Sequence, residues 1–222
     1  MVMCIHYIIG VSVGVMSQPT AIAVIEQESF RERPKPAEIT ELRLRHLERM
    51  PLDAAYPDVA VRLRAIYDGL KNKEQARESH LLVDISGTGS SVIKYFRQVS
   101  LSPMQVGITM GHGQTQVEYG NWRVSKIELV GALQGLLHTK KFKIAAGLDL
   151  VPTLIEELTN FRPKSPAMNG NDIDAWREGR FDDLVFAVAL ATWQGEREIA
   201  SPKPKAPPTD QPRSNGLSSW MG

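Results

Sequence analysis

The stretch that most constrains the fold is GRFDDLVFAVALA, from Gly179 to Ala191. Residues 184–191 include no polar side chain, so a helix formed there must be buried on nearly every side. Asp182 and Asp183 come directly before it, and the helix dipole favours negative charge at that end. Two carboxylates at one point also suit a hard divalent cation. The pair is therefore either a helix cap or part of a metal site.

The composition limits the kinds of site that the chain can build. Its 222 residues are 42% hydrophobic and 23% charged, with a formal net charge of +1, as expected for one moderate globular domain or two small ones. A near-neutral charge confines any nucleic-acid binding to a local patch. Cys4 is the only cysteine, which excludes an internal disulfide and a Cys-rich zinc site and favours a cytoplasmic location.

The two ends of the chain differ in character. Residues 1–16 are mostly apolar, but they lack a basic start, and Gly10 and Gly14 interrupt them. With the apolar run 20–25 they predict a buried hairpin rather than a targeting or membrane segment. The last residues, 201–222, are rich in proline and lack an apolar pattern. We expect one domain over 1–200 and a disordered tail after it.

Hydrophobic periodicity predicts a mixed sheet with helices on both faces. The predicted strands are 7–13, 20–27, 40–49, 81–85 and 105–110, and the predicted helices are 57–70, a short one ending at 96, 126–137, 149–160 and one at 184–191. The segment 111–124 is predicted to form a loop or a small hairpin.

Two of these elements carry a prediction about which side chains face the core. Alternation in 40–49 puts one set of side chains on one face of a strand and the next set on the other: Leu42, Leu44 and His46 against Arg43, Arg45 and Leu47. Ser125 followed by Glu128 predicts a capping box. The helix that it opens is expected to bury one stripe, made of Ile127, Val130, Leu133 and Leu137.

Asp84 is the second acidic candidate. It ends the buried run LLVD and precedes a Gly-rich turn, where a carboxylate is costly unless it is hydrogen-bonded, paired or bound to a metal. If the last helix packs on this sheet, Asp182 or Asp183 reaches Asp84, and Mg²⁺ or Mn²⁺ would relieve their repulsion. A plain turn or cap residue is the alternative. The turn 87–91 lacks the spacing and the lysine of a phosphate-binding loop.

Four segments in order, YIIGVSVGVMSQPTAIAVIE, LLVDISGTGSSVIKYFR, VSKIELVGALQGLL and GRFDDLVFAVALATW, resemble the C-terminal nuclease domain of tailed-phage large terminase subunits. The resemblance covers residues 7–193. It implies an α/β ribonuclease H-like fold, with strands one to three antiparallel and later strands parallel. It also implies a Mg²⁺- or Mn²⁺-dependent endonuclease that cuts double-stranded DNA during genome packaging in the host cytoplasm. Its protein partners would be a packaging ATPase, a small terminase or a portal protein. No association with a membrane is implied.

The resemblance assigns metal ligands residue by residue. Asp84 matches the family's second acidic ligand, and Asp182 and Asp183 match the acidic pair of which one binds metal. Ser12 stands where the family has its first acidic ligand, an Asp that usually bridges two metals. Losing that carboxylate is expected to slow the reaction by about a thousandfold or more.

Other features depart from the family pattern as well. Gln18 stands where relatives often have Asp, and Phe181 where His is common, while Glu26 and Glu28 lie too far along the second strand to substitute. The ATPase half of a large terminase is absent, which is consistent with a split gene, a nuclease-only relative, a decayed prophage gene or a truncated fragment.

We therefore expect an impaired nuclease or, alternatively, an inactive relative that binds DNA or a packaging partner. An actin-like nucleotide-binding protein is disfavoured because a second phosphate loop is missing.

Several further side chains have an open assignment. Five basic residues are expected either to contact DNA phosphates near the site or to be ordinary surface charges: Arg123, Lys126, Lys140, Lys141 and Lys143. His112 is expected to be an exposed loop residue rather than a ligand, and Trp122 and Trp176 are expected to pack rather than to stack on bases. Trp220 could anchor a partner.

Overall fold

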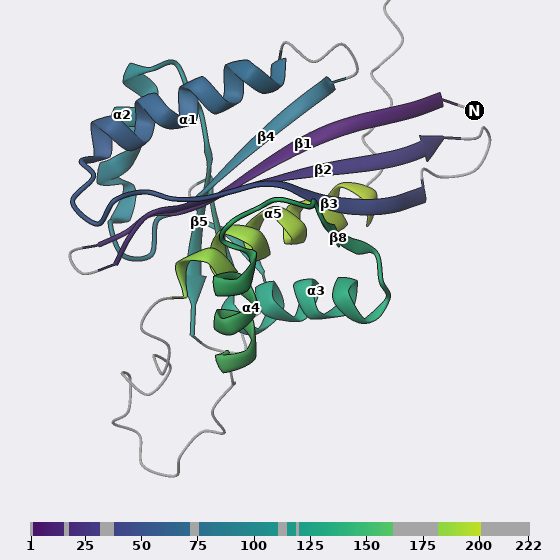
Figure 1. Cartoon of the computed structure of the whole chain (residues 1–222). Coiled ribbons are helices and arrows are strands. Elements are labelled where there is room, and N and C mark those ends of the chain that lie inside the picture. Colours follow the sequence, from purple (N-terminus) through teal and green to yellow (C-terminus); the bar gives the residue numbers. More distant parts are fainter. Residues whose placement is uncertain are drawn as a thin grey trace, which may run out of the picture.

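A computed structural model describes residues 2–15, 18–31, 38–71, 76–110, 115–118, 120–161 and 182–200. These residues form one mixed sheet with helices on both faces (Figure 1). The strands are β1 (Val2–Ser12), β2 (Ala21–Arg31), β3 (Glu38–Arg49), β4 (Ala76–Asp84), β5 (Met104–Thr109), β6 (Gln116–Glu118), β7 (Asn121–Ser125) and β8 (Phe142–Ile144). The helices are α1 (Tyr56–Lys71), α2 (Ile93–Gln98), α3 (Lys126–His138), α4 (Val151–Asn160) and α5 (Asp183–Ala200), with a short 3₁₀ turn at Gly89–Val92.

The strand order is β6-β7-β5-β4-β1-β2-β3-β8. The first three strands are antiparallel neighbours, and β4, β5 and β7 then extend the sheet parallel to β1. The edge strand β8 is parallel to β3, and β6 is antiparallel to β7. The predicted ribonuclease H-like sheet is therefore confirmed.

Helix α5 is the centre of one face of the sheet. Every residue from Leu184 to Ala191 is at most 9% exposed, because α5 packs on β1, β2 and β3 while α3 and α4 pack against it. Figure 1 shows α3, α4 and α5 together on this side of the sheet. The expectation of a helix buried all round is confirmed.

The opposite face is covered by α1 and α2, which lie over β1 and β4 (Figure 1). Val59 and Leu63 of α1 and Phe96 of α2 share a buried cluster with alternate residues of the strands, such as Val11 and Val83. Since successive strand residues point to opposite faces, the even-numbered positions at the ends of β1 and β4 face α5.

The predicted stripe of α3 was wrong in part. Leu129, Val130, Leu133 and Leu136 are buried, whereas Ile127 and Leu137 are 36% and 40% exposed. The helix contacts α5, β7 and β8. These neighbours bury a face of α3 that is rotated around the helix axis from the predicted face. Because α3 is apolar on most sides, its sequence alone does not specify which face is buried.

The predicted faces of β3 were also wrong in part. The pairing of β3 with β2 shifts register between Val24 and Ile25. After this irregularity Leu47 joins Leu42 and Leu44 in the α5-side core, and His46 is left partly exposed beside Glu48. An extra residue in one strand reverses the alternation beyond it.

Candidate metal centre

Ser12 and Asp84 lie side by side at the ends of two strands. They are register partners in the parallel pair of β1 and β4, so their backbones are about 5 Å apart. On each strand, alternate residues share a face, so Ser12 lies on the same face of β1 as Ile8, and Asp84 lies on the same face of β4 as Leu82. Ile8 and Leu82 both belong to the α5-side core. Their side chains therefore start on the same face, below the N-terminus of α5.

Ser86 holds the Asp84 carboxylate in place. The Ser86 backbone N–H donates to Asp84 Oδ1 at 2.8 Å, and the Ser86 hydroxyl donates to the same oxygen at 2.5 Å. The hydroxyl oxygen in turn accepts from the Ile108 N–H of β5 at 2.6 Å. Sequence reasoning missed Ser86. Its backbone bond to Asp84 is that of an Asx turn, which an Asp before a Gly-containing turn indicates, but the bond from its hydroxyl has no such local signal.

Asp182 approaches Asp84 from the start of α5. The pKa of Asp84 is raised by burial and by the negative charge of Asp182, while the bonds from Ser86 oppose the rise. Asp182 Oδ2 accepts from Lys126 Nζ at 3.3 Å. Lys126 is the first residue of α3 and is only 3% exposed. Segments far apart in the sequence thus meet at one edge of the sheet.

Asp183 faces a different set of partners. Arg49, the last residue of β3, donates from Nε and Nη2 to the two Asp183 carboxylate oxygens at 2.8 and 2.9 Å. Arg49 also pairs with Glu157 of α4, whose Oε2 accepts from the Val185 N–H at 3.3 Å. Burial and the charge of Asp183 raise the pKa of Glu157 to about 7. Both carboxylate oxygens of Asp183 are therefore engaged in a structural clamp.

The oxygen donors at the shared edge are the Asp84 and Asp182 carboxylates and the Ser12 hydroxyl. Mg²⁺ is commonly bound through one or two carboxylates together with water and substrate phosphates. Burial, and to a smaller extent the charge of Asp182, raise the pKa of Asp84 by disfavouring its charged form, and a bound cation would offset that cost. These donors fit one hard cation. Across the described parts of the chain, no three His, Cys, Asp or Glu side chains gather as a metal site.

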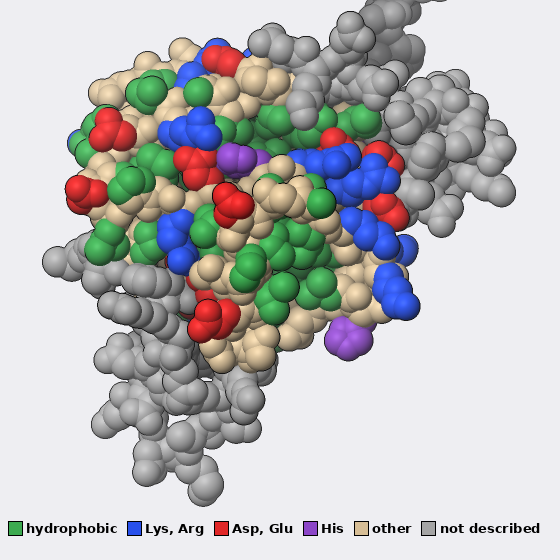
Figure 2. Space-filling model, viewed as in Figure 1, with side chains coloured by type: hydrophobic (Ala, Val, Ile, Leu, Met, Phe, Trp, Pro, Cys, Tyr) green, Lys and Arg blue, Asp and Glu red, His purple; other side chains and the backbone are tan. Residues whose placement is uncertain are grey.

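The basic candidates are spread over the molecule. Lys126 lies inside the site, whereas Lys140 and Lys141 follow the far end of the 13-residue helix α3, about 20 Å away. Lys143 lies beside Arg43 in the pairing of β8 with β3. Figure 2 shows Lys and Arg side chains gathered along the right side of the face viewed. Arg123 is exposed on β7, next to the buried Val124.

The remaining candidates have structural partners or lie outside the described residues. Glu26 points to the opposite face, where it accepts from Tyr7 at 3.1 Å and from Arg45 at 2.6 Å. Trp122 packs edge-on against Trp193 with ring centroids 5.9 Å apart, as expected for a packing residue. Four candidate residues and the tail lie outside the described residues: His112, Trp176, Phe181, Trp220 and 201–222.

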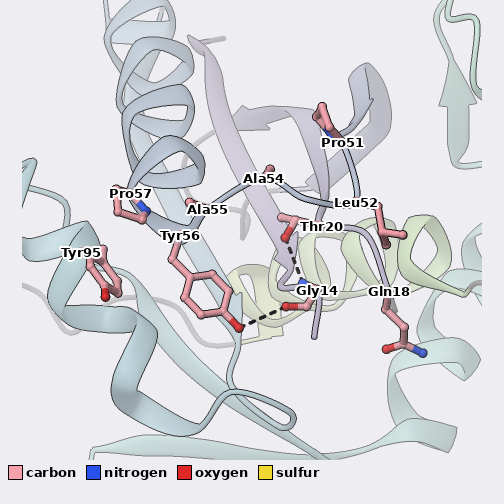
Figure 3. Close-up of a pocket in the computed structure, with 10 residues that line it drawn as sticks. All are labelled: Gly14, Gln18, Thr20, Pro51, Leu52, Ala54, Ala55, Tyr56, Pro57 and Tyr95. Atoms are coloured by element: carbon pink, nitrogen blue, oxygen red, sulfur yellow. Dashed lines mark hydrogen bonds between the residues drawn. The ribbon is translucent and has the colours of Figure 1, made fainter. Parts of the chain in front are cut away.

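A hollow of about 300 Å³ opens near the same edge of the sheet. Figure 3 shows Tyr56, Thr20 and Gly14 around it, with the Gly14 N–H donating to Thr20 Oγ1 at 2.9 Å and the Tyr56 hydroxyl facing the Gly14 carbonyl. Gln18 and Tyr95 also line it. The hollow includes neither Asp84 nor Asp182, so it is separate from the carboxylate site.

Comparison with known proteins adds the fold family. No protein-family model matches the sequence, and no curated protein does. The large terminase nuclease of the thermophilic phage G20c superposes with a TM-score of 0.52 and 19% identity, over 86% of this chain and 82% of that one. The terminase nuclease domain of human cytomegalovirus, Mn-soaked and inhibitor-bound, superposes with a TM-score of 0.51 and 14% sequence identity. This match covers 87% of this chain and 85% of that one. The chain therefore has the ribonuclease H-like fold of terminase nuclease domains, which confirms the sequence resemblance at the level of the fold.

Proposed function

We propose that this protein is a terminase-type DNA endonuclease of impaired activity, which depends on Mg²⁺ or Mn²⁺. The observation that carries the proposal is the meeting of Ser12, Asp84 and Asp182 at one edge of a sheet with this fold. The Mn-soaked form of the cytomegalovirus domain makes Mn²⁺ the first ion to test.

Asp84 and Asp182 are proposed to hold the cation, with the Ser12 hydroxyl as a neutral third donor. A bound divalent ion polarises a phosphodiester and activates water for hydrolysis. Asp183 is the less suitable member of the acidic pair, because Arg49 binds both of its oxygens. Its proposed part is to fix the start of α5, so that the preceding Asp182 stays directed at Asp84.

The impairment is proposed to originate at Ser12. A serine hydroxyl carries no charge, so the site has two carboxylates where the family pattern has three. A loss of about 4 kcal/mol of transition-state stabilisation corresponds to about a thousandfold in rate. The fold can remain intact while the chemistry is slow.

The deciding experiment is nicking of supercoiled plasmid by purified protein with Mn²⁺. We expect slow nicking by the natural chain, none by Asp84→Ala, and at least about a hundredfold faster nicking by Ser12→Asp. Two exposed positions give matched controls, Asp53→Ala for the lost carboxylate and Ser102→Asp for the added one. If Ser12→Asp nicks no faster than Ser102→Asp, the proposed site is wrong.

The alternative function is a catalytically inactive relative that binds DNA or a packaging partner. It is favoured by the same deficit at Ser12. Silence of every variant above, Ser12→Asp included, together with a gel shift of duplex DNA would support this alternative. In either case the proposed setting is the cytoplasm of a phage-infected or prophage-bearing cell, with a packaging ATPase, a small terminase or a portal protein as partner. Among the described residues, no helix combines the length and apolar character needed to span a bilayer.

A further inference from the structure

We infer that Lys126 is a built-in cation of the candidate site, which competes with metal for Asp182 and limits the site to one divalent ion. The inference rests on the proposed metal site and adds to it the number of ions and a residue that sets their affinity.

The location of Lys126 is an unusual one for a lysine. Only 3% of the residue is exposed, although lysine is almost never fully buried unless it is paired. It is also the first residue of α3, where the helix dipole disfavours a positive charge. Ser125 and Glu128 already cap this helix by a hydrogen bond of 3.1 Å, so helix capping does not account for the ammonium group.

The surroundings direct the ammonium group to the site. Lys126 Nζ lies 4.7 Å from the ring centroid of Phe161 and 4.6 Å from that of Phe186. Both rings present a face that attracts a cation. Nζ is 3.3 Å from Asp182 Oδ2, and the Asp182 side chain is 22% exposed. The lysine therefore reaches the carboxylate from the protein interior, and the accessible side of the carboxylate stays open to an ion.

The charges explain why the number of ions should be small. Asp84 and Asp182 contribute two negative charges, Lys126 contributes one positive charge, and Ser12 contributes none. A single divalent ion already exceeds the remaining negative charge. A second ion would sit among donors with no carboxylate left to balance it, and such a site is strongly unfavourable in a partly buried setting.

The test is a titration of the full chain with Mn²⁺, in which the electron paramagnetic resonance signal of the free ion reports how much is bound. It needs no activity assay. We expect at most one Mn²⁺ per natural chain. Lys126→Met keeps an unbranched side chain of similar length between the two rings and removes the charge. It should bind Mn²⁺ at least about tenfold more tightly, because a repelling charge beside Asp182 is gone.

Two variants separate this effect from others. Lys71→Met is the matched control, because Lys71 also lies over an aromatic ring, at 4.8 Å from Tyr67, but is exposed at the far end of α1. It removes the same net charge and should leave the Mn²⁺ affinity unchanged. Lys126→Arg keeps the charge and should bind Mn²⁺ no more tightly than the natural chain. If Lys126→Met fails to fold by circular dichroism, Lys126→Gln takes its place.

The outcomes also separate this inference from the proposed function. An unchanged or weaker Mn²⁺ affinity in the folded neutral variant overturns the role of Lys126, even if Ser12→Asp binds Mn²⁺ well. Two or more Mn²⁺ ions on the natural chain overturn the limit to one ion. Absence of binding in the natural chain together with binding in Lys126→Met supports the inference. Absence of binding in all variants, Ser12→Asp included, overturns both the inference and the proposed site.

Discussion

Gly10 of β1 and Ala187 of α5 touch through their backbones. A Cβ atom placed on Gly10 would lie 2.1 Å from the Ala187 carbonyl oxygen and 3.0 Å from the Ala191 nitrogen. No side chain separates the strand from the helix at this point. Because Ser12 follows on β1 and Asp182 precedes α5, this contact sets the distance across the candidate site.

Gly10→Ala should therefore disturb both stability and the site. We expect a loss of about 1–3 kcal/mol or more in unfolding free energy, because backbone atoms cannot rotate away as a side chain can. Urea unfolding measures the loss. Gly69→Ala on α1 is the control, since nothing lies within 4 Å of its added Cβ, and it should stabilise the helix by up to about 1 kcal/mol. Equal stability of the two variants would contradict the close contact.

Arg49 should be more important for stability than a surface arginine with similar geometry. Arg49→Met leaves two buried carboxylates, Asp183 and Glu157, without their shared partner. We expect a loss of about 3–5 kcal/mol at pH 8 by urea unfolding. Arg62 pairs with Glu48 from a side chain that is 43% exposed, so Arg62→Met should cost less than about 1 kcal/mol. A similar small loss in both variants would show that the clamp does not hold α4 and α5 together.

The raised pKa of Glu157 predicts how stability depends on pH. The folded chain holds a proton on Glu157 up to about pH 7, whereas the ordinary value for an unfolded glutamate is 4.5. The folded state therefore binds more protons in this window, and stability falls as the pH rises through it, by up to about 3 kcal/mol. Glu157→Gln should flatten the decline between pH 5 and 8. Glu156→Gln, its exposed neighbour on α4, should leave the decline unchanged, and equal slopes in both variants would contradict the assignment.

Ser86 should act through Asp84. Ser86→Ala removes a hydroxyl that lowers the pKa of Asp84 and that accepts from the Ile108 N–H. We expect the acidic limb of the pH–rate profile for Mn²⁺-dependent nicking to move to higher pH, since the Asp84 carboxyl group then loses its proton only at a higher pH. Because the natural chain is expected to nick slowly, both profiles are measured in the Ser12→Asp background, where the nicking rate is high enough to measure. Ser91→Ala removes an exposed hydroxyl bonded to the Thr88 carbonyl at 2.7 Å and should not move the limb.

Much of the fold was predictable because its signals are local. The apolar run 184–191 specifies a buried helix by composition alone. Ser125 is the expected N-cap and accepts from the Glu128 N–H, but the Glu128 carboxylate accepts from Thr115 and Trp193 instead of completing the predicted capping box. The three-residue strand β8 was not predicted. It is too short to show a period, and it exists because it completes the edge beside β3.

The candidate site was predictable in its carboxylates but not in their partners. Asp84 stands out because a charge at the end of an apolar strand is costly. The choice between Asp182 and Asp183 depends on Arg49, which lies 134 residues from Asp183 in the sequence. The burial of Lys126 depends likewise on Phe161 and Phe186. Pairings at such separations have no local pattern, so only the folded chain shows them.

The central position of α5 has a consequence for the chain during its synthesis. The first three strands can pair as soon as they are made, but the helix that covers their α5-side core begins only at Asp183. Until that helix has left the ribosome, a row of Ile, Leu and Ala side chains faces water with no cover. Such surface invites aggregation and chaperone binding. A nascent chain halted before α5 should therefore remain sensitive to protease, and one halted after it should become resistant.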